Sequence, residues 1–180
     1  MNDFKDFCEI KKGNKNPVKQ CTKNLNIRRV NMPQITNKTL LSEFIKVCRS
    51  LNYVVTDDVL LKDVHKLKVF TSQKEVNETK ALQIPTNIKH KIPVIMLKKN
   101  DEYMVLDGHH RWLAHHLKKV PLKILQIDIS NTTHSLESSF RKVNNTLKKN
   151  KKNFHPGHTI SHSQTKKITK KGKGKTLKMC

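Results

Sequence analysis

The stretch Tyr-Met-Val-Leu-Asp-Gly-His-His-Arg-Trp-Leu-Ala, residues 103–114, joins an apolar strand pattern to a helical pattern. The apolar run ends at Leu106, and Gly108 is the only glycine between Gly13 and Gly157. Glycine permits a tight turn and lets the backbone approach a ligand closely. The sequence therefore predicts a strand over 103–106, a turn at Asp107-Gly108 and a helix over about 109–118.

The residues after this turn suit an anion. The first N–H groups of a helix point outward, and with the helix dipole they favour negative charge. His110 and Arg111 add donors from the first turn, and a guanidinium can hold two phosphate oxygens at once. We therefore interpret Gly108, His109, His110 and Arg111 as a phosphate-binding loop.

Asp107 does not fit a purely anion-binding loop. A carboxylate beside a phosphate is repulsive unless a metal ion bridges the two or a substrate proton is to be removed. One interpretation is that Asp107 caps the helix while the histidines are ordinary surface donors. The other is that Asp107 holds Mg²⁺ and is a catalytic residue of a transfer site.

Helices and strands alternate on both sides of the junction. The predicted elements are helices over about 38–51, 72–82, 109–118 and 134–147, and strands over 53–55, 59–61, 93–97, 103–106 and 122–129. The helix at 72 is predicted from the capping-box pattern Ser72-Gln73-Lys74-Glu75, and the two short strands are predicted to flank a turn at Asp57-Asp58. This order predicts an α+β (mixed α/β) domain over 27–147, a small sheet with flanking helices.

Charge is concentrated outside this domain. The 180 residues include 37 Lys and Arg against 14 Asp and Glu, a formal charge of +23. Residues 148–180 hold eleven lysines and no acidic residue, so we expect a disordered tail, and residues 1–26 suggest a second, loosely ordered basic arm. The tail either binds nucleic acid non-specifically or serves solubility or localisation. Its candidate nucleic-acid contacts are Lys166, Lys167, Lys170, Lys171, Lys173 and Lys175.

Other classes of protein fit the sequence poorly. There is no run of about 20 apolar residues, and the N-terminus lacks a secretory pattern, so we expect an intracellular protein with reduced cysteines and no membrane contact. The pairs His109-His110 and His115-His116 lack the spacing of a helical zinc site.

The segment Asp107–Trp112 resembles a motif of the ParB/sulfiredoxin superfamily, in the form found in ADP-dependent free serine kinases and related ParB-like proteins. The resemblance covers about residues 59–129. In that family the loop binds nucleotide phosphates, of CTP in ParB, ATP in sulfiredoxin and ADP in the kinases. The resemblance implies a nucleotide (ADP, ATP or CTP) with Mg²⁺, held at residues 108–111. The catalytic cysteine of sulfiredoxin falls on His109, which excludes sulfiredoxin chemistry.

Two further segments extend the resemblance. Residues 67–76 look like the family's other shared segment, which implies that Thr71, Ser72 and Gln73 contact the nucleotide and that Glu75 is the catalytic base. Gln73 or Glu78 aligns with that base in other registers, and the capping box explains Glu75 without catalysis. Arg28–Gln34 is similar to an R-x-x-M-P-Q segment of some phage and large-virus ParB-like proteins.

Three functions follow as hypotheses. The first is a nucleotide-dependent enzyme of the ParB-like group, a small phosphotransferase. The second is a DNA-binding protein whose basic extensions hold nucleic acid while the domain is a nucleotide-gated clamp or a degraded enzyme. A nuclease is the weakest, because no cluster of carboxylates suits two metal ions.

Overall fold

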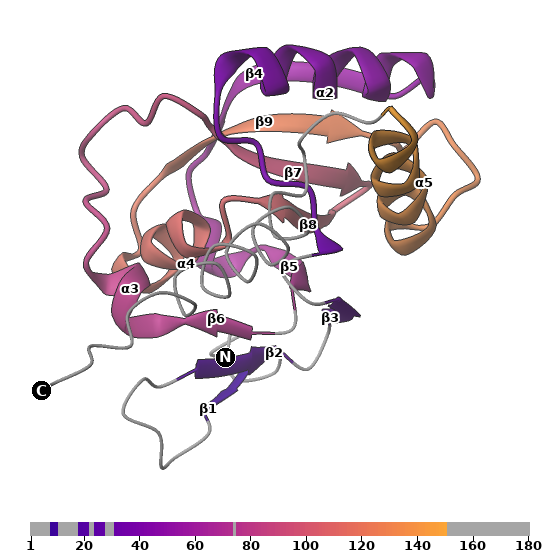
Figure 1. Cartoon of the computed structure of the whole chain (residues 1–180). Coiled ribbons are helices and arrows are strands. Elements are labelled where there is room, and N and C mark those ends of the chain that lie inside the picture. Colours follow the sequence, from indigo (N-terminus) through magenta and orange to yellow (C-terminus); the bar gives the residue numbers. More distant parts are fainter. Residues whose placement is uncertain (1–7, 11–17, 22–23, 28–30, 74, 151–180) are drawn as a thin grey trace, which may run out of the picture.

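The computed structural model describes residues 8–10, 18–21, 24–27, 31–73 and 75–150 (Figure 1). Within these ranges six strands form a mixed sheet in the order β3-β5-β8-β7-β9-β4. The strands are β3(Asn24–Ile27), β5(Lys68–Gln73), β8(Glu102–Asp107), β7(Val94–Lys99), β9(Leu122–Asp128) and β4(Val54–Leu61). The helices are α2(Lys38–Ser50), α3(Glu78–Leu82), α4(His109–Lys118) and α5(Leu136–Lys149), with a 3₁₀ turn η2(Val64–Lys66). The predicted α+β fold is confirmed.

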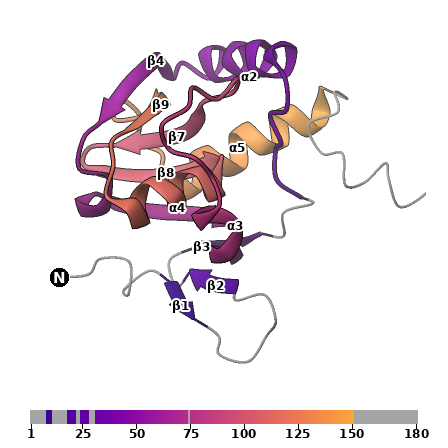
Figure 2. The same ribbon diagram turned by 90° about the vertical axis from the view of Figure 1, so that its left-hand side faces the viewer.

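Helices cover both faces of the sheet (Figures 1 and 2). Side chains alternate along β7, so Ile95 and Leu97 join the core under α2 and α5 while Val94 and Met96 join the core under α3 and α4. The α5 stripe Leu136, Phe140, Val143 and Leu147 lies in the first of these cores, as its spacing indicates. Among the residues that the structure describes, no helix is both long and apolar enough to span a bilayer.

The Asp107-Gly108 turn follows the carboxyl end of β8, an inner strand of the sheet. β8 runs parallel to β5, so the carboxyl ends of these strands meet at the same edge. β7 is antiparallel to β8 and pairs Ile95 with Asp107, which brings the start of β7 beside the turn. The predicted strands over 93–97 and 103–106 pair as an antiparallel hairpin, and the predicted helix over 109–118 is confirmed.

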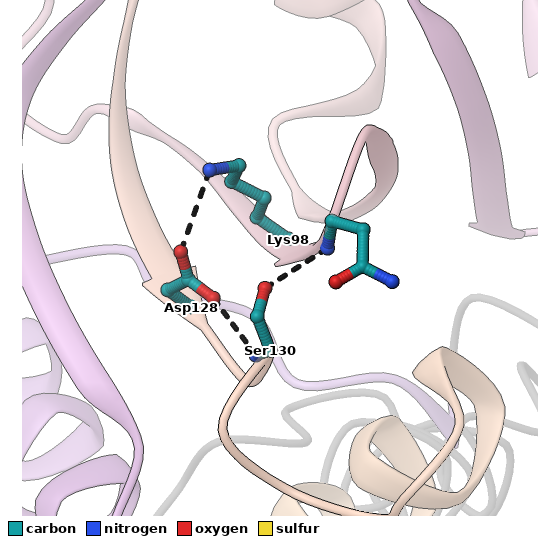
Figure 3. A network of polar contacts seen from close by, with 4 residues as sticks. Lys98, Asp128 and Ser130 are labelled. Atoms are coloured by element: carbon teal, nitrogen blue, oxygen red, sulfur yellow. Dashed lines mark hydrogen bonds and ion pairs between the residues drawn. The ribbon is translucent and has the colours of Figure 1, made fainter.

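A polar network fixes the opposite edge of the sheet (Figure 3). Asp128 at the end of β9 pairs with Lys98 Nζ at 3.5 Å and accepts from Ser130 N at 2.8 Å, and Asn100 N donates to Ser130 Oγ at 2.9 Å. Burial alone would raise the pKa of Asp128. The hydrogen bonds from Ser130 and the charge of Lys98 lower it by more, so the pKa of Asp128 is below its usual value. The network ties the β7–β8 turn to the chain that leads into α5.

Two predicted elements differ from the structure. Residues 54–61 form one strand rather than two, because the irregularity at Asp57-Asp58, where Asp58 has φ +54°, is a break in register against β9 and not a reversal. Ser72 does not begin a helix. The chain continues as β5 and then β6(Glu75–Asn77), and α3 begins after Asn77, whose side chain accepts from Lys80 N at 2.9 Å.

Described strands and a helix extend across the predicted domain boundaries. Described residues of the 1–26 segment form strands β1(Cys8–Ile10) and β2(Val18–Cys21), which make a small antiparallel sheet with β6. Residues 1–7, 11–17 and 22–23 lie outside the described residues, so the interpretation of 1–26 as a loosely ordered arm stays a prediction. At the other end α5 runs through Lys149, so the predicted boundary at 147 falls inside a helix. Residues 151–180, with the six candidate lysines of the tail, lie outside the described residues.

Candidate functional site

A cavity of about 450 Å³ opens where β8 ends and α4 begins. Four segments line it: residues 32–36, Gln73 at the end of β5, part of the loop between α3 and β7, and residues 106–111. The loop contributes Ile84, Pro85 and His90. Ligands of mixed and parallel sheets bind in this position, beyond the carboxyl ends of the strands.

Gly108 makes the turn into α4 possible. It is the N-cap residue and has φ +87°, a left-handed conformation that side chains disfavour. A Cβ at this position would lie 2.9 Å from Arg111 Nη2 and 3.2 Å from Val94 Cα. Because Gly108 has no side chain, the Arg111 guanidinium can lie over the turn at the N-terminus of α4.

Arg111 is held in place by the α3–β7 loop. Its Nη1 donates to the carbonyl oxygen of Ile92, and the side chain is half-buried on the cavity wall. Burial lowers the pKa of Arg111, and the nearby Asp107 carboxylate raises it. An arginine keeps its charge in proteins, so the lowered pKa indicates a cation that has lost part of its hydration. An anion beside this cation would stabilise its charge.

Asp107 connects the turn to the segment before α2. Its Oδ2 accepts from Ile35 N at 3.3 Å, which fixes residues 32–36 as a wall of the cavity. The interpretation of Asp107 as the helix cap is wrong, because Gly108 occupies the cap position and β8 extends through Asp107. The carboxylate still belongs to the cavity lining.

The two histidines of the motif serve different neighbours. Ser72 Oγ donates to Val105 O at 2.7 Å, so its contact with His109 Nε2 at 3.1 Å has the imidazole as donor. His109 is 5% exposed and joins α4 to β5. His110 Nε2 accepts from Asn77 N at 3.2 Å, which places its proton on Nδ1. His110 is half-buried and lines the cavity.

The structure brings six of the predicted residues to one cavity: Gln73, Asp107, Gly108, His109, His110 and Arg111. It does not bring Thr71 and Ser72 there. They are 1% and 0% exposed, and the Ser72 hydroxyl bonds to Val105 and His109, so their contact with a nucleotide stays a prediction. Glu75 lies in β6, but its side chain is outside the described residues, so its predicted role as base stays a prediction.

Sequence reasoning missed part of the cavity wall. The R-x-x-M-P-Q likeness ends at Gln34 and implies kinship but no contact with the motif, and nothing in the sequence marks Ile35 and Thr36. The loop residues Ile84, Pro85 and His90 carry no pattern that distinguishes them from an ordinary connection. They reach the cavity because Lys118 Nζ donates to Ile84 O at 2.8 Å and Arg111 holds Ile92.

A metal ion would find few protein ligands here. In the described part of the chain no group of three or more His, Cys, Asp and Glu side chains is placed to hold one. Asp107 is the one carboxylate among the described lining residues, and a hard cation there would need further ligand oxygens from a bound phosphate.

Comparisons with protein-family models, with curated proteins and with solved structures find no match.

Proposed function

We propose that this chain is a ParB/sulfiredoxin-like nucleotide-binding protein that holds the phosphates of a nucleoside di- or triphosphate at residues 108–111. The observation that carries the proposal is the 450 Å³ cavity at the start of α4, lined by Gly108, His110 and Arg111. This volume falls within the range of small-molecule sites. The Asp107–Trp112 motif and its likeness to the superfamily supply the nucleotide as the expected ligand.

Three features of the cavity favour phosphate over a neutral ligand. The N-terminal turn of the ten-residue helix α4 faces it, and its dipole favours an anion. The Arg111 guanidinium is fixed by Ile92 and retains further N–H donors, in the planar arrangement that matches two phosphate oxygens. Its lowered pKa describes a partly dehydrated cation, whose burial an anion would offset.

Asp107 fits a magnesium-bound nucleotide. Phosphate-transfer sites bind Mg²⁺ through one or two carboxylates together with substrate phosphates, so one carboxylate at the phosphate end of the cavity is sufficient. The ion would neutralise phosphate charge there. We propose on this basis a small phosphotransferase, in which Asp107 holds the ion or orients the acceptor, and Glu75 is the candidate base.

Titration calorimetry with ADP, ATP and CTP, with and without Mg²⁺, tests the binding step. Arg111→Ala should weaken nucleotide binding by about 1.5–3 kcal/mol, the range for a charge-assisted hydrogen bond. Arg141→Ala is the matched control, because Arg141 is exposed on α5 and bonded to Glu137 at 2.8 Å. Binding that is equal in the two variants would remove Arg111 from the site, and no binding by the unmodified protein would overturn the proposal.

The charge distribution favours a second candidate, a DNA-binding ParB-like protein. Eleven of the 37 basic residues lie in residues 148–180, which contain no acidic side chain. Lysines of this density bind phosphate backbones with a steep dependence on salt. In this case the cavity would serve as a nucleotide-dependent switch rather than a reaction site.

A further inference from the structure

The loop between α3 and β7, residues 83–93, is attached to α4 at both of its ends. Arg111 in the first turn of α4 donates to Ile92 O, and Lys118 in the last turn donates to Ile84 O at 2.8 Å. Residues seven apart lie on the same side of a helix, about 10 Å from each other along its axis. Because α3 also packs beside α4 (Figures 1 and 2), the loop and the two helices share one surface next to the cavity.

This surface is basic. Residues 79–100 and 108–127, which include the loop, all of α4 and all but the first residue of α3, contain no Asp or Glu. The one acidic residue of these elements is Glu78, which is half-buried at the start of α3. The lysines of the surface are all exposed: Lys80 on α3, Lys89 and Lys91 in the loop, and Lys118 and Lys119 at the end of α4.

These five lysines have no carboxylate partner, unlike several lysines elsewhere. Ion pairs neutralise other exposed lysines: Lys46 pairs with Glu43 at 3.5 Å, Lys66 with Asp63 at 3.2 Å, and Lys123 with Asp58 at 3.9 Å. Within the described residues none of the five lies within ion-pair distance of an acidic side chain. Their charges are therefore available to a polyanion, which releases counterions when lysines bind its phosphates.

Two large apolar side chains accompany these lysines. Leu82 at the end of α3 is 51% exposed, and Ile88 in the loop is 53% exposed. We call the five lysines, Leu82 and Ile88 together the α3–α4 surface. A partner that offers charge alone gains nothing from the two apolar side chains. An unpaired strand of nucleic acid offers both phosphates and base faces, whereas a duplex keeps its base faces stacked on each other.

We propose that the α3–α4 surface binds single-stranded nucleic acid, with the phosphates against its lysines and base faces against Leu82 and Ile88. An acidic protein segment would match the charge, but the adjoining cavity favours phosphate, because the Arg111 guanidinium and the N-terminal turn of α4 line it. The inference goes beyond the proposed function, since none of the seven residues lines the cavity. It also places a nucleic-acid surface on the folded domain, separate from the basic tail.

The test measures binding of the full-length protein to a fluorescent oligothymidine strand as the salt concentration rises. Lys89→Gln combined with Lys119→Gln should reduce the slope of log affinity against log salt by about 1.4, which is about 0.7 for each lost phosphate contact. This slope corresponds to an affinity about 25-fold lower at about 0.1 M salt. Lys118 is left unchanged, because its Nζ holds the cavity wall at Ile84 O.

The matched control is Lys46→Gln combined with Lys66→Gln. It removes the same formal charge from two exposed lysines that pair with Glu43 and Asp63, and it should leave the slope unchanged. Because the tail is the same in every variant, its contribution cancels from the comparison. Thermal unfolding of each variant shows whether it is folded before binding is measured.

A second pair of variants tests the contact with bases. Ile88→Ser should weaken binding of the strand about three- to tenfold, the effect of losing partial burial of one isoleucine, and should leave binding of a duplex of the same length unchanged. Val54→Ser is the control, because Val54 is 54% exposed on β4, outside the α3–α4 surface. It should change neither affinity.

The outcomes separate this inference from the proposed function. If the unmodified protein does not bind the strand, or if the two double variants have equal slopes, the inference is refuted. It is also refuted if Ile88→Ser weakens strand and duplex by the same factor, or if the Lys89 and Lys119 double variant weakens poly-glutamate as much as the strand. All variants should keep their affinity for ADP. If ADP fails to bind while the double variant loses affinity for the strand, the proposed function is wrong and the α3–α4 surface stands.

Discussion

Replacing Gly108 with alanine should both destabilise the domain and displace Arg111. Gly108 has φ +87°, and a left-handed conformation costs a residue with a side chain about 1–2 kcal/mol. The new Cβ would meet Arg111 Nη2 at 2.9 Å and Val94 Cα at 3.2 Å. The guanidinium can move away, but Val94 Cα belongs to a central strand and cannot. The guanidinium would therefore leave its place over the turn and lose the Ile92 carbonyl.

The expected loss of stability is about 1–3 kcal/mol after allowing for the lower entropy of an unfolded alanine chain. This corresponds to a fall in melting temperature of roughly 2–10 °C for a protein of this size. Fluorescence of Trp112 is a suitable assay, because it is the only tryptophan, is 2% exposed, and its backbone N–H donates to Gly108 O at 2.9 Å. Urea titration followed at this residue reports unfolding next to the substitution.

The opposite end of α4 supplies a control of opposite sign. Lys119 is the C-cap residue and has φ +54°, also left-handed. Lys119→Gly should stabilise the protein by up to about 1 kcal/mol, because glycine adopts this conformation without the side-chain penalty. If Gly108→Ala unfolds at the same urea concentration as the unmodified protein, or binds nucleotide equally well, the reasoning about the turn is refuted.

Three further predictions follow from the site and its surroundings. Asp107→Asn should keep nucleotide binding, since an amide oxygen can still accept from Ile35 N. It should abolish phosphoryl transfer in a turnover assay and reduce the effect of Mg²⁺ on nucleotide affinity. Retained turnover would show that the carboxylate only supports the fold. Burial lowers the pKa of His115 below its ordinary 6.5, despite the 2.6 Å bond from Nδ1 to Pro121 O, so the unfolded state binds the proton first as the pH falls. Stability should therefore be full above about pH 6.5 and decline below it, and His115→Gln should show a smaller decline between pH 7.5 and 5.5 in urea titrations; an equal decline would assign the effect elsewhere. A chain ending at Asn150, which keeps all of α5, should lose most affinity for duplex DNA in a salt-dependent binding assay while keeping its affinity for nucleotide; unchanged DNA binding would place the nucleic-acid surface on the folded domain.

Much of the fold was predictable because its signals are local. The helix over 38–51 and the hairpin ending at Leu106 follow from apolar periodicity, and the structure has α2 at Lys38–Ser50 and β7 paired with β8. The turn at Gly108 followed from an isolated glycine between two patterns. These elements are determined by residues within about ten positions of each other in the sequence.

The failures have a common physical cause, which is competition from distant partners. Ser72 and Glu75 match a capping box, but Ser72 lies near the end of β5, beside β8. There its hydroxyl donates to Val105 O and accepts from His109 Nε2. Tertiary hydrogen bonds with residues more than 30 positions away outweighed a local propensity worth about 1 kcal/mol. Asn77, which does cap α3, accepts from Lys80 N, and no described residue distant in sequence bonds to its side-chain oxygen.

The same reasoning explains why the motif could be found from the sequence while the cavity could not. Two walls of the cavity are attached to the motif through backbone atoms: Ile35 N bonds to Asp107, and Ile92 O accepts from Arg111. Almost any residue offers these backbone groups, so the attached segments carry no signature of the contact. The motif side chains therefore have a double role, since Asp107 and Arg111 both line the cavity and hold its walls in place. Substitutions at either residue must be judged by stability and by binding together, because a loss of binding alone does not distinguish a missing ligand contact from a displaced wall.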